Sequence, residues 1–288
     1  MHIASGWKDY KIIATGDGYK LEQWKDIILL RPDPQVIWKG ERNLFAYPHI
    51  DAIYMRSERG GGAWNFKRPL PNFWTIQYKN LEFKVQLMGF KHTGLFPEQA
   101  VNWERMQSLI ERSVATGRKI KILNLFAYTG GASIACAKAG AEVVHVDAAK
   151  NMVERAGENA RLSGINKGIR YIVDDCKKFV LRELKRGNRY DGILMDPPSY
   201  GRGPNGELWK IEDHLFDFVK LATQLLVVNP LFMLINSYTT GLQPMVLGNI
   251  LQLLLGDRVG KIEAYEVGLP TEEGIYLPCG AGGIYYNG

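Results

Sequence analysis

The feature that most constrains the fold is a regular alternation of apolar runs and helical patterns, from about residue 119 to residue 256. Runs such as KIKILNLFAY (119–128) and AEVVHVDAA (141–149) are largely apolar, which is typical of strands buried on both faces. Each is followed by a stretch with apolar residues at helical spacing, such as KNMVERAGENARLSG (150–164). This order predicts an α/β fold with a mostly parallel sheet covered by helices.

The same pattern continues on both sides of these segments. Further strands are expected over 169–175, 190–198 and 231–239, and further helices over 98–117, 129–140, 176–187, 214–227 and 244–256. No helical pattern separates the last two strand candidates, 259–267 and 274–288. They therefore predict an antiparallel hairpin at one edge of the sheet.

Residues 1–90 have a different pattern. Short runs rich in β-branched and aromatic residues, punctuated by Pro and Gly, predict strands at 24–32, 49–57, 73–79 and 81–89. We therefore expect a small β-rich domain over 1–90 and a second domain over 91–288. The first domain holds 13 Lys/Arg and 9 Asp/Glu, which is +4 of the net charge of +6. This excess fits two interpretations equally well: contact with an anionic partner, or ordinary lysines on the surface.

Composition narrows the class of protein. Hydrophobic residues make up 46% and charged residues 23% of the 288 residues, as in soluble globular proteins. No apolar run reaches the ~18 residues that span a membrane, and the first residues lack a signal-peptide core. We expect a cytosolic monomer or homodimer. Three widely spaced cysteines and five histidines without ligand spacing predict neither a disulfide framework nor a metal site.

Candidate ligand-binding residues follow the predicted strands, because ligands of such sheets bind beyond the strand carboxyl ends. The first strand leads into Phe126-Ala127-Tyr128-Thr129-Gly130-Gly131, a turn whose small residues admit either a ligand or close packing. It lacks the G-x-G-x-x-G pattern of dinucleotide sites. The second strand ends at Asp147, which could bind a ribose diol, cap the next helix, or do both.

The third and fourth strands also end in carboxylates. After the third come Asp174 and Asp175, either of which could accept a hydrogen bond from an adenine amino group. Pleat register decides which one points inward, and we favour Asp175. The fourth strand ends at Asp196-Pro197-Pro198, where two prolines stiffen the chain. Four consecutive strand ends of this kind predict one site.

Together these segments resemble the motifs of class I S-adenosylmethionine-dependent methyltransferases, which have a Rossmann-like sheet. The segments are ILNLFAYTGGAS, VVHVDAAKNMVERAGENARLSG, YIVDDCKKF and ILMDPPSYG. The combination of FAYTGG, VDA and DPPSYG is similar to bacterial methyltransferases of large-subunit ribosomal RNA, and HTGLFPEQAVNWERM resembles a segment that precedes their catalytic core. The resemblance is close over about residues 90–240 and looser afterwards.

The resemblance implies roles for individual residues. It implies that S-adenosyl-L-methionine is bound by Asn124, Phe126, Ala127, Tyr128, Gly130, Asp147, Ala148, Asp175, Cys176 and Asp196. Asp147 would hold the ribose and Asp175 the adenine amine, while Asn124 stands where many methyltransferases have an acid. The catalytic group would comprise Asp196, Pro197, Pro198 and Tyr200.

The acceptor atom can be narrowed by chemistry. Methylation of a pyrimidine C5 needs a covalent cysteine, and Cys136, Cys176 and Cys279 do not lie in the loops that would supply one. A base nitrogen remains, oriented by Asp196 or the Pro197 carbonyl, with Tyr200 stacking on the base or packing in its loop. The segment GRGPNGELWK (201–210) is either a lid that contacts RNA or a solvated turn.

We expect methylation of ribosomal RNA, but three alternatives remain open. The same fold and cofactor could serve a protein or small-molecule substrate. An NAD-linked oxidoreductase is disfavoured by the missing glycine pattern. A non-catalytic RNA-binding module is disfavoured by the intact acidic strand ends.

Overall fold

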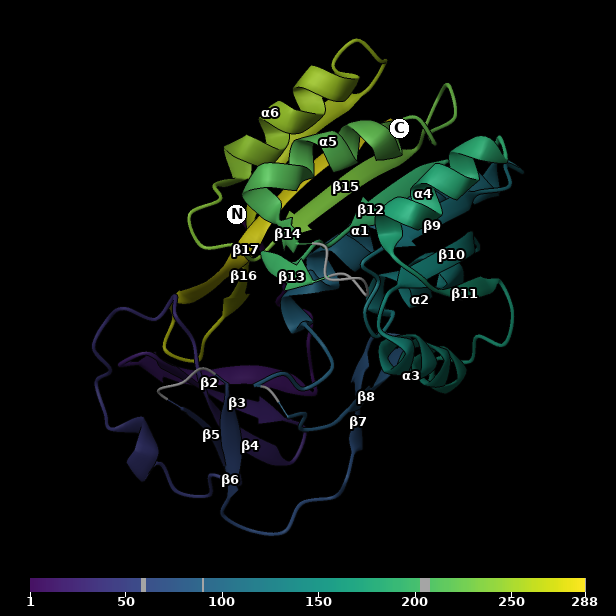
Figure 1. Ribbon diagram of the computed structural model, residues 1–288. Helices are drawn as coiled ribbons and strands as arrows, with labels where there is room; N and C mark the ends of the chain where they lie inside the picture. The colour runs from purple at the N-terminus through teal and green to yellow at the C-terminus, as the bar shows by residue number, and fades with distance from the viewer. Residues whose placement is uncertain (58–60, 90, 203–207, 288) are drawn as a thin grey trace. The chain divides into compact units, whose positions relative to one another are not determined.

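A computed structural model describes residues 1–57, 61–89, 91–202 and 208–287 (Figure 1). The chain forms two compact units. Unit 1 comprises Met1, 102–266 and 280–288, and unit 2 comprises 2–101 and 267–279. The bounds of these compact units differ from those of the predicted domains, 1–90 and 91–288. The predicted domain boundary stays a prediction.

Unit 1 contains most of a mostly parallel sheet, as predicted, and the first strand of this sheet, His2–Ile3, belongs to unit 2 (Figure 1). The strand order is β1-β16-β17-β15-β12-β9-β10-β11. The strands are β1 (His2–Ile3), β9 (Lys121–Leu125), β10 (Glu142–Asp147), β11 (Ile169–Val173), β12 (Gly192–Met195), β15 (Phe232–Ser237), β16 (Lys261–Pro270) and β17 (Tyr276–Tyr286). Strands β11, β10, β9, β12 and β15 pair in parallel, and β17 pairs antiparallel with β15. The β16 and β17 strands continue into the residues of unit 2.

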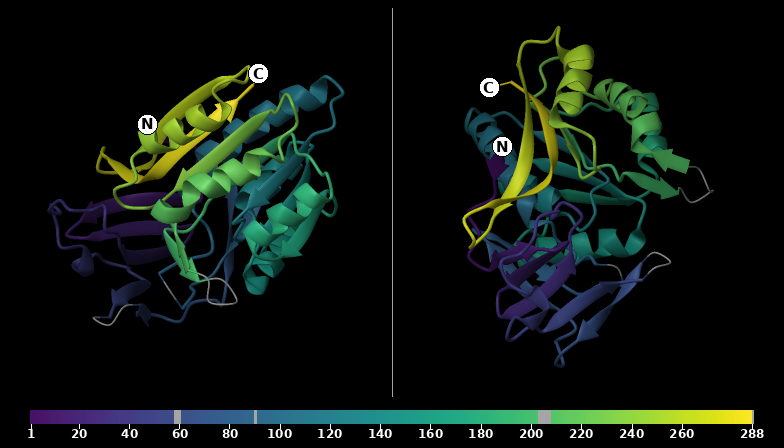
Figure 2. Two further views of the ribbon diagram at one scale, coloured as in Figure 1. Left: turned by 45° about the horizontal axis from the view of Figure 1, so that its top comes forward. Right: turned by 90° about the vertical axis from the view of Figure 1, so that its left-hand side faces the viewer.

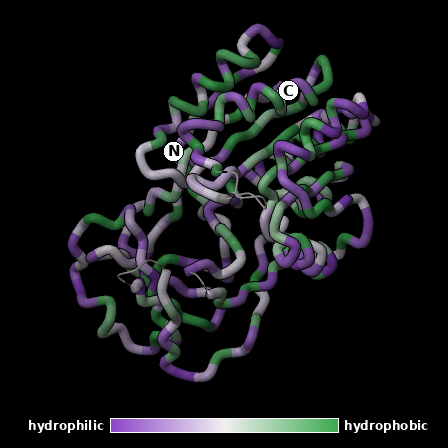
Figure 3. Tube along the Cα trace, viewed as in Figure 1, coloured by the Kyte–Doolittle hydropathy of each residue, from purple (hydrophilic) through white to green (hydrophobic). Residues whose placement is uncertain are grey.

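The described part of the chain has six α-helices, which cover the sheet on both faces (Figure 2). They are α1 (Ala100–Ala115), α2 (Gly131–Lys138), α3 (Lys150–Leu162), α4 (Cys176–Lys185), α5 (Ile211–Thr223) and α6 (Pro244–Leu255). Helices α4, α5 and α6 share one apolar core with alternate residues of the central strands, such as Leu125, Met195 and Ile235. Because side chains alternate along a strand, the residues between these belong to the opposite face, where α2 lies. Hydrophobic stretches accordingly follow the strands in Figure 3.

Unit 2 is β-rich, as the sequence predicted. Its described strands outside β16 and β17 are β1, β2 (Tyr10–Gly16), β3 (Tyr19–Trp24), β4 (Ile27–Pro32), β5 (Ala52–Arg56), β6 (Gly62–Phe66), β7 (Trp74–Tyr78) and β8 (Leu81–Val85). Strands β2 to β6 form one sheet in sequence order, and β7 and β8 form a separate hairpin. Two short 3₁₀ helices, η1 (Leu44–Ala46) and η2 (Pro97–Gln99), complete the described elements of this unit. The β2, β3 and β6 strands were not predicted.

Candidate functional site

The acidic and small residues singled out in the sequence follow neighbouring parallel strands. Strands β11, β10, β9 and β12 are adjacent in that order, with Val173 beside Asp147 and Leu125 beside both Val146 and Met195. Parallel strands in this register end at the same edge of the sheet. The loop after β9, Asp147, Asp175 and Asp196 therefore lie along one edge of the sheet.

The loop after β9 has an unusual backbone. Phe126 and Tyr128 have φ angles of 55° and 49°, and Gly130 has a φ of 88°. Left-handed φ angles in residues other than glycine cost about 1–3 kcal/mol and persist where surrounding contacts impose them. Here the Ala127 amide donates to the Val146 carbonyl at 3.0 Å, which joins the loop to β10. A Cβ on Gly130 would lie 2.8 Å from the Cβ of Ala156, so only glycine fits against α3.

Asp147 fixes the same loop through its side chain. One carboxylate oxygen accepts from the Tyr128 amide and the other from the Ala149 amide, each at 2.8 Å. The carboxylate is half-buried and is oriented by two backbone donors from different segments. A carboxylate has about four lone-pair sites, so both oxygens can accept a further donor. Ala148, the next residue, is exposed.

Asn124 is buried beneath the loop. Its amide nitrogen donates to Ser133 Oγ at 2.8 Å, and Ser133 Oγ lies 3.0 Å from His145 Nδ1. Burial lowers the pKa of His145 to about 4, so the imidazole is neutral at pH 7. The network connects β9, α2 and β10, and it gives the Asn124 side chain a structural partner.

The two aspartates after β11 have different partners. Asp174 forms an ion pair with Arg182 of α4. Asp175 is the N-cap of α4, and its Oδ1 accepts from the Lys178 amide at 2.8 Å. Asp175, the residue favoured for the adenine contact, is thus also the capping residue of α4. The buried Cys176 thiol accepts from the Phe126 amide at 3.3 Å, which connects this strand end to the loop after β9.

Asp196 lies beside a buried asparagine. Its Oδ1 accepts from Asn236 Nδ2 at 3.0 Å. Met195 of β12 and Ile235 of β15 are register partners, so the following residues, Asp196 and Asn236, are neighbours at the strand ends. The Asn236 side chain is only 1% exposed, and its Oδ1 has no hydrogen-bond partner in the described structure.

The segment after Asp196 is connected to the loop after β9 by a tryptophan. Strands β13 (Tyr200–Arg202) and β14 (Leu208–Lys210) pair antiparallel, and their connection at 203–207 lies outside the described residues. The Trp209 indole donates to the Pro198 carbonyl at 2.6 Å, and its ring centroid lies 5.5 Å from that of Phe126. Pro197 is buried, whereas the Tyr200 side chain is 55% exposed and available to a partner.

The cysteines are poor nucleophiles in this structure. Burial raises the pKa of the thiols of Cys136, Cys176 and Cys279, so each is protonated at neutral pH. Within the described residues, no three or more His, Cys, Asp or Glu side chains are grouped as metal ligands would be. In the same part of the chain, no helix has the length and apolar character that a membrane span requires.

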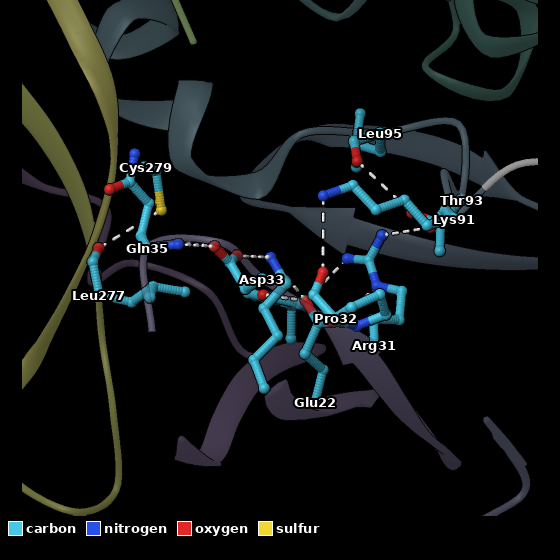
Figure 4. A network of polar contacts seen from close by, with 12 residues as sticks. Glu22, Arg31, Pro32, Asp33, Gln35, Lys91, Thr93, Leu95, Leu277 and Cys279 are labelled. Atoms are coloured by element: carbon cyan, nitrogen blue, oxygen red, sulfur yellow. Dashed lines mark hydrogen bonds and ion pairs between the residues drawn. The ribbon is translucent and has the colours of Figure 1, made fainter. Parts of the chain in front are cut away.

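Unit 2 contains a buried cluster of charges (Figure 4). Glu22 is fully buried, and its two oxygens accept from Arg31 Nε at 2.5 Å and Arg31 Nη2 at 2.8 Å. Tyr10 donates to the same carboxylate at 2.7 Å. Burial alone would raise the pKa of Glu22, but Arg31 and Lys20 outweigh it and hold the pKa at about 2.

Lys91 borders this cluster without a carboxylate partner among the described residues. Its ammonium donates to the Pro32 carbonyl at 3.5 Å, and its own carbonyl accepts from Arg31 (Figure 4). The pKa of Lys91 is lowered to about 8, chiefly by burial; Asp33 opposes this shift, and the nearby charges of Lys20 and Arg31 contribute to it. The cluster therefore has a cation whose charge an anionic ligand would stabilise.

Comparison with known proteins decides the family. The family model described as S-adenosylmethionine-dependent methyltransferase matches residues 53–243. The chain belongs to this family. A solved structure, the SAM-dependent methyltransferase from Agrobacterium tumefaciens, is 34% identical and has a TM-score of 0.90, over 98% of this chain and 91% of that one. The expected fold class and the cofactor, S-adenosyl-L-methionine, are thereby confirmed.

Several curated relatives of this methyltransferase have names that describe methylation of ribosomal RNA. The ribosomal RNA large subunit methyltransferase K/L of Allochromatium vinosum is 30% identical over 175 residues, which are 59% of this chain and 23% of that protein. A 23S rRNA uracil C5-methyltransferase of Neisseria lactamica is 32% identical over 128 residues, 44% of this chain and 28% of that protein. The expected resemblance to such enzymes is confirmed. The chain spans well under half the length of these two relatives.

Sequence reasoning missed two residues at this edge. Asn236 was not singled out, although it is a polar residue near the end of the apolar strand expected over 231–239. Trp209 lies in a segment interpreted as a lid or turn, and no local pattern indicates its contact with Phe126. The first could have been found by applying the strand-end argument to one more strand; the second could not.

Proposed function

We propose that this methyltransferase transfers a methyl group from S-adenosyl-L-methionine to a base nitrogen of large-subunit ribosomal RNA, in the cytoplasm. The observation that carries the proposal is the common sheet edge at which Asp147, Asp175 and Asp196 follow three strands of one parallel sheet. The names of the curated relatives support ribosomal RNA as the substrate class.

The donor side of the proposed site consists of the loops after β9, β10 and β11. Asp147 has the acceptors for a ribose diol, because each carboxylate oxygen accepts from one backbone amide and can accept from a ribose hydroxyl as well. Asp175 and the backbone at Cys176 would bind the adenine, and Ala148 would lie along the nucleoside. Phe126, Ala127, Tyr128 and Gly130 would surround the methionine part, with Asn124 supporting them from below through Ser133.

The acceptor side consists of Asp196, Pro197, Pro198 and Tyr200. When bound, S-adenosyl-L-methionine supplies an electrophilic methyl group on a sulfonium sulfur. Asp196 would accept a hydrogen bond from the base, and the fixed φ of the prolines would hold the Pro197 carbonyl in place. Tyr200 is exposed enough to stack on an extruded base, an interaction worth roughly 1–3 kcal/mol.

A nitrogen acceptor is favoured over a pyrimidine carbon. Attack through C5 would need a thiolate, and burial keeps the thiols of Cys136 and Cys176 protonated. This distinguishes the proposed reaction from the one named for the Neisseria relative.

The test is incorporation of labelled methyl groups into ribosomal RNA isolated from cells that lack the protein. We expect incorporation by the full chain that is lost when the RNA is digested before the reaction. In a parallel reaction with a whole extract of these cells, label that enters protein or small molecules but not RNA would refute the substrate class and favour the alternative substrates. The state of the chain during the assay, monomer or homodimer, can be measured in parallel by light scattering.

Unit 2 would contribute RNA affinity through Lys91. Its ammonium has no ion-pair partner among the described residues, and a phosphate would stabilise the charge that burial disfavours. We expect Lys91→Met to weaken RNA binding and to reduce its salt dependence by about one phosphate contact. The exposed Lys39, which pairs with Asp17, provides the control variant Lys39→Met. Equal RNA affinity and equal salt slopes for both variants would refute this contact.

A further inference from the structure

The side-chain amide of Asn236 is buried at the sheet edge, and only one of its two polar atoms has a hydrogen-bond partner in the described structure. Its nitrogen donates to Asp196, yet its oxygen, in a side chain that is 1% exposed, has no partner in the described structure. Burial of an acceptor without a hydrogen bond costs about 1–3 kcal/mol. Proteins rarely retain such a group without a functional or structural reason.

The position of Asn236 indicates which ligand would satisfy it. Met195 and Ile235 contribute to the core shared with α4, α5 and α6. Because side chains alternate along a strand, Asp196 and Asn236 both project to the opposite face of the sheet. Asn236 is therefore on the same side as Asp196, immediately beside the proposed acceptor position.

On its other side, Asn236 is bounded by an aromatic ring. Gly282 of β17 is the register partner of Asn236, and a Cβ there would lie 2.5 Å from the ring of Tyr265. Directly opposed residues of an antiparallel pair project to the same face. The Tyr265 hydroxyl is occupied, since it donates to Asn102 Oδ1 at 2.5 Å.

We infer that Asn236 contacts the substrate and, with Asp196, forms a pair of acceptors for an exocyclic amino group. The substrate is then an amino-bearing base: adenine, cytosine, or guanine through its 2-amino group. One N–H would donate to Asn236 Oδ1 and the other to the Asp196 carboxylate. This inference rests on the proposed function and specifies its acceptor atom.

Two acceptors suit the chemistry of an amine. With both hydrogens held, the nitrogen lone pair is the remaining direction for attack. The nitrogen forms a bond to the methyl carbon while the carbon–sulfur bond breaks and its electron pair stays on sulfur, which leaves a neutral thioether. The nitrogen then releases one proton to the Asp196 carboxylate, from which it passes to water. A ring nitrogen such as guanine N7 carries no hydrogen and would leave Asn236 Oδ1 unsatisfied.

The first experiment identifies the methylated nucleoside by mass spectrometry, after reaction of the wild-type chain with ribosomal RNA from cells that lack it. We expect a nucleoside methylated on an exocyclic amine. Methylation at guanine N7, at a pyrimidine carbon or at a ribose oxygen would overturn the inference while leaving RNA methylation intact. Failure to methylate RNA at all would instead refute the proposed function.

The second experiment uses Asn236→Leu, which removes both polar atoms at similar volume. We expect single-turnover methyl transfer to fall by about 10- to 100-fold, consistent with loss of one or two hydrogen bonds to the reacting group. The affinity for S-adenosylhomocysteine should stay within about twofold, because Asn236 lies on the acceptor side. A merely structural residue would lower both together, and unchanged methyl transfer would refute the role.

Asn249 on α6 offers a matched control, because it is exposed and Asn249→Leu makes the same chemical change. Thermal unfolding of both variants checks that the fold is retained. If Asn236→Leu does not fold, the nucleoside identity from the wild-type chain decides the question by itself.

Discussion

The assignment of Asp147 as the ribose ligand can be tested by Asp147→Asn. The carboxylate has two oxygens, each already accepting from a backbone amide at 2.8 Å. Asparagine keeps one acceptor oxygen and places an NH₂ where the other was, so one ribose hydroxyl loses a charged acceptor. A hydrogen bond to a charged group is worth about 1.5–3 kcal/mol. The dissociation constant of S-adenosylhomocysteine should therefore rise by about 10- to 150-fold.

Isothermal titration calorimetry measures this constant directly. The control is Asp174→Asn, an equivalent change after the adjacent strand, where the carboxylate pairs with Arg182. Because that pair is partly exposed, we expect its removal to change the affinity by no more than about twofold. Thermal unfolding of Asp147→Asn shows whether the loop after β9 is still folded. If folded Asp147→Asn binds as tightly as Asp174→Asn, the reasoning for the donor side is wrong.

Two further predictions concern stability. Gly130→Ala should destabilise the fold by more than 1 kcal/mol, since φ is 88° and the new Cβ would lie 2.8 Å from that of Ala156; chemical denaturation measures this, and an unchanged midpoint would contradict it. Glu22→Gln should lower the free energy of unfolding at pH 7 by about 3–5 kcal/mol, because Arg31 would keep its buried charge without a counter-charge. The pKa of Glu22 in the folded protein, about 2, lies below its ordinary value of 4.5, so the stabilisation by its carboxylate is present above pH 4.5 and is lost as the pH falls toward 2. Chemical denaturation across this pH range should show the loss in the wild type. An equal loss in Glu22→Gln would argue against Glu22 as its source.

The order of elements in unit 1 was predictable because burial on both faces leaves a signal in the local sequence. Runs such as 119–128 and 141–149 are apolar enough to be identified without any knowledge of their partners. The strand-end residues follow from the same pattern, since parallel strands end together. The family motifs could likewise be found locally.

What could not be predicted depends on contacts between distant segments. The β3 strand carries Glu22, which looks like a solvated residue but is fully buried because Arg31 of β4 neutralises it. The choice between Asp174 and Asp175 depends on which one caps α4, a detail of local geometry that either aspartate could satisfy. No local sequence pattern likewise predicts that residues 267–279 belong to the same compact unit as the N-terminal part of the chain.

Trp209 has a consequence for how the two sides of the reaction communicate. Its indole contacts Phe126, which belongs to the proposed donor side, and donates to Pro198, which belongs to the proposed acceptor side. A displacement of one loop changes the surroundings of a rigid group that the other loop also contacts. Under the proposed function, cofactor affinity and RNA affinity would then be linked quantities, and thermodynamic reciprocity would require each ligand to alter the binding of the other by the same factor.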